Sequence, residues 1–517
     1  MGSQGRYYTK NLLLVMLKKL FYFVVCSSLL LFYSCTNSSK DLVRLSLNIV
    51  NEPHSLDTKR LRSLSDINIA NMLFEGLFRT TNEGLKQALA EKYWIDESQT
   101  KIKIQLKKAF WSDGSLITAH DFVKTYETIL DPDFPADYAF LFYYIKGAEK
   151  IKKEHADLCS LGVKALDEMH LEFELNHPTP FFLELLSLPV FFPSSGKEGV
   201  YNGPFCLYNW FHNYQITLRK NDHYWDKQQV KIDQVELHMC DSETGLQLFE
   251  KGLLDLEGSP FGVIPPDSKA ALAQQNRLFT QPIWGTQWIR VNTSRDELSD
   301  KYFRQAMAAA IDRKDLCEHI LYNPQAQSLR ICPHSLCATA LKDGAKDHVH
   351  QLLQTSHQTR ILTLSYANSA LNHRLAQAIQ SQLDSCGIQI QLERLEPKVF
   401  FSRVSKKDYD LALGNWIADV PDPINFLQNF RTQDTGTNNT CWENTSFKEL
   451  LDQSQFLKGN ERVYALEKAE QILLDEVPVI PLYQMSMQYV KNPQLRGVYI
   501  NKLGLIDIKE AYFADED

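Results

Sequence analysis

The sequence predicts a soluble α/β protein with two or three domains. At 517 residues the chain is too long for one ordinary hydrophobic core. Its composition, 44% hydrophobic and 23% charged residues, is that of a globular protein. Segments with the two-residue alternation of strands are followed by segments with helical spacing, the order typical of α/β folds. The net charge of −8 gives no basis for binding nucleic acid.

The first predicted elements follow one another closely. Leu42–Ile49 alternates apolar and polar residues and predicts a strand, and Pro53 lies in the loop that ends it. Asp66–Leu77 has apolar residues at helical spacing. Lys101–Leu106 predicts a further strand.

A helix is predicted from Thr118 to Leu130. Thr118 is the expected N-cap and Asp121 completes a near-capping box, while Asp131-Pro132 ends the helix. The preceding Ala109–Gly114 predicts a hairpin-like turn in which Trp111 packs and touches no ligand. Phe303–Ile311 has the spacing of a core helix.

The stretch around Trp416 and Asp419 is the strongest candidate for a binding site. Tyr409–Trp416 predicts a short buried strand, and Pro421 and Pro423 force a turn after it. A carboxylate at a strand end beside an indole ring suits a ligand ammonium group. Taken alone, the segment also fits a core tryptophan followed by a turn aspartate, and this structural interpretation is the preferred one.

The cysteine pattern is not that of a disulfide framework or a metal site. Cys332 and Cys337 are the closest pair outside the N-terminal leader, with His334 between them, and their spacing fits no tight zinc-ligand pattern. We therefore predict no metal and no cofactor. A disulfide between Cys332 and Cys337 stays open.

Residues 1–35 predict a signal peptide. Lys18 and Lys19 precede an apolar run too short for a membrane span, and Met16 is the expected start. The run ends at Cys35, in a context similar to a bacterial lipobox, so Cys35 is the expected lipidation site. Residues 36–41 read as a polar tether. A plain secretory signal and an uncleaved anchor are the alternatives.

Several motifs in combination resemble the family 5 extracellular solute-binding proteins, the oligopeptide-, dipeptide- and nickel-type receptors of ABC importers. The similar segments run from about Leu42 to the C-terminus. They are ALAEKYW, KIKIQL, AFWSDGSLITAHDFVKTYETILDP, YNGPFCLYNW, VNTSRDELSDKYFRQAMAAAIDRKDL, YDLALGNWIADVPDP and VPVIPLYQ.

This resemblance implies a two-lobed periplasmic-binding-protein clamshell of mixed sheets, with an extra domain inserted in the first lobe. The implied division is lobe one at 42–74, 197–287 and 487–517, the inserted domain at 75–196, and lobe two at 288–486.

The resemblance also implies a peptide held extended in the interlobe cleft, pairing backbone with backbone. Asp419 matches the aspartate that binds the peptide amino terminus, and Trp416 the adjacent tryptophan. The further implied site residues are Asn415, Ile417, Arg62, Ser63, Leu64, Tyr138 and Tyr483.

Two positions depart from the peptide receptors. Leu413 and Asn372 stand where such receptors can have a basic and a histidine side chain facing the carboxy end of the ligand. The departure leaves open longer peptides, modified peptides such as cell-wall fragments, or a carboxylate bound elsewhere.

The implied function is a lipid-anchored extracytoplasmic receptor, a monomer, that delivers oligopeptides to ABC importer permease subunits. The same-fold alternative is a receptor for another cargo, namely a cell-wall peptide, a nickel complex or haem. We predict no enzyme activity, because the sequence has no G-x-S-x-G, H-E-x-x-H, P-loop or Rossmann glycine motif. A structural or adhesive lipoprotein with the same fold is the remaining alternative.

Overall fold

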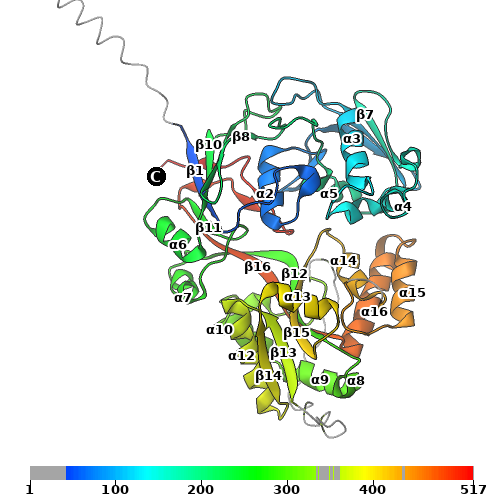
Figure 1. The fold of residues 1–517 in the computed structure, drawn as a ribbon, viewed down its shortest axis with the longest axis vertical. Helices are drawn as coiled ribbons and strands as arrows, with labels where there is room; N and C mark the ends of the chain where they lie inside the picture. Colours follow the sequence, from blue (N-terminus) through cyan, green and yellow to red (C-terminus); the bar gives the residue numbers. More distant parts are fainter. Residues whose placement is uncertain are drawn as a thin grey trace, which may run out of the picture. The chain divides into compact units, whose positions relative to one another are not determined.

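A ten-stranded mixed sheet organises the chain in the computed structural model (Figure 1), which describes residues 42–333, 336, 349, 353, 361–433 and 437–515. The elements below belong to one unit, Arg44–Asp517. In spatial order the strands are β14 (Ile390–Leu395), β13 (Leu362–Ala367), β15 (Leu411–Ile417), β12 (Phe279–Val291), β16 (Val479–Lys491), β11 (Leu256–Gly258), β1 (Arg44–Ile49), β10 (Gln234–Met239), β9 (Gln215–Lys220) and β8 (Phe205–Phe211).

The long antiparallel pair β12 and β16 lies in the middle of this sheet (Figure 1). Strands β13, β14 and β15 continue the sheet on one side, and β11, β1, β10, β9 and β8 on the other. The ladder between β12 and β16 is interrupted from Pro282 to Thr286, where β12 has three residues against one on β16. Such an irregularity bends the bulged strand and increases its twist.

Helices surround the β13–β15 end of the sheet. A large apolar cluster joins α9 and α12 to β13 and β15, and a second joins α14, α15 and α16 to β12. The helices after β12 are α8 (Asp296–Ser299), α9 (Lys301–Ala310), α10 (Arg313–His319), α12 (Ala370–Ser385), α13 (Pro397–Ser405), α14 (Ile424–Leu427), α15 (Thr445–Ser454) and α16 (Gly459–Glu476), with 3₁₀ turns η5 (Pro324–Ala326) and η6 (Gln428–Phe430).

A separate four-stranded sheet lies between β1 and β8 in the sequence. Its order is β4 (Ala90–Ile95), β5 (Lys101–Leu106), β7 (His170–Glu174) and β6 (Val163–Ala165). The helices before β12 are α2 (Leu64–Leu73), α3 (Ala119–Leu130), α4 (Ala148–Glu154), α5 (Phe182–Leu185), α6 (Ser242–Glu250) and α7 (Pro266–Gln274), with turns η1 (Thr58–Arg60), η2 (Ala139–Tyr144), η3 (Leu158–Ser160) and η4 (Pro189–Phe191). The remaining paired strands are β2 (Phe78–Thr81) with β3 (Gly84–Gln87), β17 (Leu495–Arg496) with β20 (Tyr512–Phe513), and β18 (Tyr499–Ile500) with β19 (Ile506–Asp507).

Most of the predicted elements are confirmed, with shifted ends. β5 has the predicted bounds, and β1 and α9 each cover most of the predicted segment. The α3 helix begins after Thr118, whose N–H donates to the Asp121 carboxylate at 2.8 Å, as the capping pattern predicts. Trp111 is buried.

The helix predicted at Asp66–Leu77 was misplaced by a few residues. The Asp66 carboxylate accepts the backbone N–H groups of His54, Arg62 and Ser63, so it sits in the first turn and α2 begins at Leu64. The helix ends at Leu73, because Phe74 is extended. The Leu73 carbonyl then accepts the Gly203 N–H.

The C-terminal tail is fixed to α2 and β2 by a buried ionic network. The Arg79 guanidinium donates to both oxygens of Asp507 at 2.7 and 2.8 Å and to Glu75 at 3.1 Å. The Tyr224 hydroxyl donates to the other Glu75 oxygen. Asn71 in α2 donates to the Ile506 carbonyl. Residues 506 and 507 are thereby held against α2 and β2.

We predict that Arg79→Met lowers the free energy of unfolding by about 3–5 kcal/mol, since two buried carboxylates lose their cation. Urea unfolding measures the change. Lys86→Met is the control, because its pair with Glu83 is exposed on both sides and should contribute little to stability. Equal effects of the two variants would contradict this account of the tail.

Candidate binding site at the end of strand β15

The turn after β15 is held by two side chains of its own segment and one from α16. Arg462 donates to both oxygens of Asp422, at 2.7 and 2.9 Å, and both side chains are nearly buried. Asp422 also accepts the Ile424 N–H at the start of α14. Pro421 and Pro423 flank Asp422, so the chain cannot continue as strand or helix there.

Asn425 positions both Trp416 and Asp419. Its side-chain oxygen accepts the indole Nε1–H of Trp416 at 2.8 Å and the backbone N–H of Asp419 at 3.1 Å. One amide oxygen therefore sets the orientation of the ring and the direction in which the chain leaves the strand. The predicted strand at Tyr409–Trp416 is confirmed as β15, Leu411–Ile417.

The interruption of the β12–β16 ladder brings this turn next to the C-terminal tail. Trp284 lies in the interrupted part of β12, and its carbonyl accepts the Ala418 N–H at 2.7 Å. Its own N–H donates to the Lys502 carbonyl at 2.6 Å. A single residue of β12 thus links the residue before Asp419 to the segment that carries Leu503 and Leu505.

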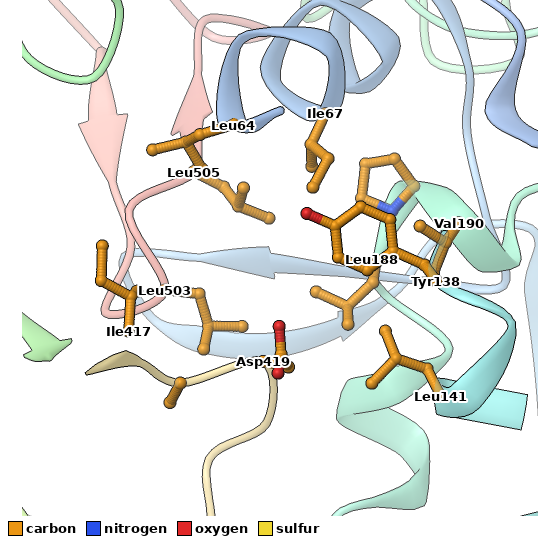
Figure 2. A pocket seen from close by; sticks show the side chains of 12 residues that line it. Leu64, Ile67, Tyr138, Leu141, Leu188, Val190, Ile417, Asp419, Leu503 and Leu505 are labelled. Carbon is orange, nitrogen blue, oxygen red and sulfur yellow. The ribbon is translucent and has the colours of Figure 1, made fainter. Parts of the chain in front are cut away.

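A cavity of about 230 Å³ opens where these segments meet α2, η2 and η4. Figure 2 shows the Asp419 carboxylate between Leu503 and Leu141, with the Tyr138 ring above it. The other lining side chains are apolar. The full lining is Leu64, Ile67, Tyr138, Leu141, Leu188, Pro189, Val190, Ile417, Ala418, Asp419, Leu503 and Leu505.

Asp419 is a carboxylate without a cation. Within the described part of the chain it forms no ion pair, and burial raises its pKa to about 6, although the Asn425 side chain lowers the pKa by a smaller amount. Burial also raises the pKa of Tyr138 to about 12, and the Asp419 charge adds to that rise. The cavity therefore combines apolar walls with one desolvated negative charge, the environment that an ammonium group on an apolar body would satisfy.

Strand β15 has an unpaired edge next to this cavity. It pairs with β12 along its whole length, Leu411–Ile417, but with β13 only at Leu411 and Ala412. From Leu413 to Ile417, the backbone groups that face away from β12 have no partner strand among the described residues. An extended chain can add to such an edge.

The structure brings several of the predicted site residues together and leaves others apart. Leu64, Tyr138, Ile417 and Asp419 line one cavity. Trp416 lies behind it, held by Asn425.

The predicted site residues before α2 differ in their roles. Ser63 caps α2. Arg62 is half-exposed and lies 3.5 Å from Asp137. Asn415 is exposed, with its Nδ2 3.6 Å from the Met485 sulfur.

Tyr483 does not lie at the cavity. Its ring is buried in the apolar cluster formed by β12, β15, β16 and the helices α9, α10 and α12. Strand β16 turns alternate side chains to opposite faces, and this one faces the core.

Leu413 and Asn372 also have structural roles. Leu413 is buried in the same cluster, and the Asn372 side chain donates to the Ala367 carbonyl at 3.0 Å. Cys35 and Cys337 lie outside the described residues. Within the described residues no helix is long and apolar enough to span a membrane, and no three His, Cys, Asp or Glu side chains gather as metal ligands.

Sequence reasoning missed most of the apolar lining. Ile67, Leu141, Leu188, Val190, Leu503 and Leu505 come from four segments far apart in the chain. Each resembles an ordinary core leucine, isoleucine or valine, so no local pattern separates it from the core.

We predict that Asp419→Asn stabilises the empty protein by about 1–3 kcal/mol at pH 7, because the raised pKa means that burial penalises the charged form. The gain is full above pH 6 and disappears as the pH falls below the ordinary Asp pKa, where the wild-type carboxyl is protonated in both the folded and unfolded states. Urea unfolding between pH 4 and 7.5 measures it.

Asp422→Asn, three residues away, is the matched control. It leaves Arg462 without its anion, so it should destabilise the protein. A loss of stability in Asp419→Asn would contradict the proposed cost of its charge.

Comparisons with known proteins agree with the architecture. Residues 84–438 match the bacterial extracellular solute-binding proteins, family 5, middle region. The oligopeptide-binding protein OppA of Bacillus subtilis is 31% identical, and the match covers 92% of this chain and 93% of that protein.

Two solved structures are similar over nearly the whole chain. The oligopeptide-binding protein OppAIV of Borrelia burgdorferi has a TM-score of 0.79 at 26% identity and covers 91% of this chain and 100% of its own. Listeria monocytogenes OppA bound to peptide has a TM-score of 0.75 at 26% identity, covering 92% and 100%. The predicted two-lobed α/β fold is thereby confirmed.

Proposed function

Because this chain belongs to the bacterial extracellular solute-binding proteins of family 5, we propose that it is an extracytoplasmic receptor that binds oligopeptides between its lobes. In this proposal the ligand is handed to the permease subunits of an ABC importer. Relatives named as oligopeptide-binding proteins, one of them bound to peptide, support the ligand class.

One observation supports this proposal most strongly. The buried Asp419 carboxylate has no cation among the described residues, and it lies beside the edge of β15 that has no partner strand there. A peptide has the complementary groups, an ammonium group followed by an extended backbone. With the ammonium group at Asp419, the peptide runs antiparallel to β15 along Ile417–Leu413. Asn415 and Ile417 then lie on the pairing edge, and Arg62, Ser63 and Leu64 supply the opposite wall.

The cavity walls indicate what the first residue of the ligand is like. Around Asp419 the lining is almost entirely leucine, isoleucine and valine, with the Tyr138 ring. An apolar first side chain would remove this surface from water. Each buried CH₂ group contributes about 0.8 kcal/mol, so Leu or Phe should be preferred to Ser or Lys at that position.

Neither of the two positions expected to face the carboxy end of the ligand carries a cation. Leu413 is buried and Asn372 is engaged with a backbone carbonyl. The lack of a cation at these two positions favours peptides long enough for their carboxy end to lie outside the cleft. It also favours cell-wall peptides, whose carboxylates differ from those of ordinary peptides. A nickel complex or haem fits less well, because the cavity lining contains no His or Cys.

The proposed division of the chain follows the sequence boundaries given above. Residues 42–74, 197–287 and 487–517 form lobe one, 75–196 the inserted domain and 288–486 lobe two. The hydrogen bonds of the Ile506 backbone with Asn68 and Asn71 support assigning the tail to the first lobe. Tyr483 would then act by packing within lobe two rather than by contact with the peptide.

The test of the proposal is a cycle of two changes measured by titration calorimetry. Asp419→Ala should weaken binding of a free-amino peptide by about 3–5 kcal/mol, roughly two to three and a half decades, because the ammonium group loses its buried partner. N-acetylating the peptide should weaken wild-type binding similarly and hardly affect the variant.

Glu83→Ala, which removes an exposed carboxylate from the turn between β2 and β3, should bind free and acetylated peptides like the wild type. If wild-type protein bound acetylated and free peptides equally well, Asp419 would be a turn residue without a role in recognition.

The membrane anchor is a second part of the proposal. Cys35→Ala should abolish incorporation of radiolabelled fatty acid and release the protein into the soluble extracytoplasmic fraction, since the thiol that carries the lipid is gone. Cys26→Ala, in the apolar run before it, should keep both label and membrane association. Labelling of Cys35→Ala at the wild-type level would refute the lipoprotein assignment.

A further inference from the structure

Two hydrogen-bond donors on one face of β12 lack acceptors. Trp288 is 1% exposed and its Nε1–H has no hydrogen-bond partner. Arg290 is mostly buried, and within the described residues its guanidinium takes part in no hydrogen bond or ion pair. Burial lowers the pKa of Arg290, and the nearby Tyr409 hydroxyl raises it by a smaller amount. Buried polar groups left in this state are uncommon and require an explanation.

Other buried arginines of the chain show the usual arrangement. Arg304 donates to the carbonyls of Leu298 and Glu476, and Arg330 to the Glu470 carboxylate. Arg290 therefore differs from them in having its charge desolvated without an anion or a carbonyl in return.

Both free donors meet at Gly414. Trp288 lies directly opposite Gly414 across the β12–β15 ladder, and Arg290 lies opposite the next residue on that face, Ala412. A Cβ atom at Gly414 would lie 2.6 Å from the Arg290 Cζ and 3.1 Å from the Trp288 Nε1. The guanidinium thus occupies the space that a side chain of residue 414 would fill, and only glycine leaves that space open.

Gly414 belongs to the part of β15 whose outer edge is unpaired. A strand added there would lie about 4.8 Å away, and its residue opposite Gly414 would turn its side chain to the same face. The Cβ of that residue would be about 4.5–5.5 Å from the space that the guanidinium fills. A Glu or Asp carboxylate on this side chain reaches the Arg290 guanidinium, which lies over the Trp288 ring, 5.7 Å from its centroid.

We propose that Arg290 and Trp288 form a specificity subsite for one acidic side chain of the bound peptide. This inference rests on the proposed function and adds a preference to it: an acidic residue at the ligand position opposite Gly414. The guanidinium takes the carboxylate as a charge-assisted pair, and the Trp288 ring supports the guanidinium through a cation–π contact.

The strand geometry makes the preference positional. Neighbouring ligand residues point to the opposite face, away from Arg290. The ligand residue two positions nearer the amino end lies opposite Trp416 and points to the same face of the sheet as Arg290. There it meets the Trp416 ring, whose N–H already donates to Asn425. When a single Glu is moved along the ligand, the affinity should therefore rise at one position and stay unchanged at the positions on both sides of it.

The experiment uses heptapeptides of Ala and Ser with a free amino group and a single Glu at positions 2 to 7, each paired with its Gln counterpart. Titration calorimetry on the full soluble domain should give a Glu-over-Gln affinity ratio of about tenfold or more at one position, and near one at its neighbours. In Arg290→Met the ratio at that position should fall to near one.

Arg394→Met, which removes an exposed arginine from the edge strand β14 of the same sheet, should keep the wild-type ratio. Gly414→Ala, which displaces the guanidinium, should lose the ratio as Arg290→Met does and provides the test if Arg290→Met does not fold.

Two outcomes overturn the inference: a ratio near one at every position in wild-type protein, or a preference that survives in Arg290→Met. Failure of the underlying peptide-binding function would look different. In that case neither the Glu nor the Gln peptides would bind the wild type at all.

Discussion

Two hydrogen bonds of the Trp284 backbone set the position of the whole candidate site. The β12–β16 ladder is interrupted at this residue, whose N–H donates to the Lys502 carbonyl and whose carbonyl accepts the Ala418 N–H. Strand β15, the turn with Asp419 and the tail with Leu503 meet there. The bond to Ala418 continues the β12–β15 ladder one residue beyond Ile417, and the bond to Lys502 adds the tail, so one residue of β12 positions both sides of the cavity.

Neighbouring polar groups of the site have two different roles, because some hold the turn and one faces the cavity. Asp422 and Arg462 neutralise each other and hold the turn, while Asn425 fixes Trp416 and the Asp419 backbone. These groups are satisfied, so they contribute rigidity. Within the described residues the Asp419 carboxylate has no cation, and it lies within a rigid frame, so its charge is available to a ligand without any rearrangement of the turn.

The sequence predicted the elements whose pattern is local, and it missed what depends on distant segments. The capping box at Thr118 and the strand at Lys101–Leu106 were correct because neighbouring residues determine them. Asp419 could be singled out only through the resemblance of its segment to the family, because the segment alone also fits a turn aspartate. Leu188 and Leu505 could not, because only the tertiary fold brings them together. Arg290 gave no signal either, since its lack of a partner is a property of the folded sheet.

The unpaired edge of β15 has a consequence for the colloidal behaviour of the empty protein. A free strand edge can pair with the edge of another molecule and so begin aggregation. Here the edge is limited to Leu413–Ile417, and of these five residues only Asn415 is exposed. A flat edge from a second folded copy cannot approach so short and recessed a segment, whereas a single flexible chain can enter. The recess that admits a ligand therefore also protects the receptor from its own copies at high concentration.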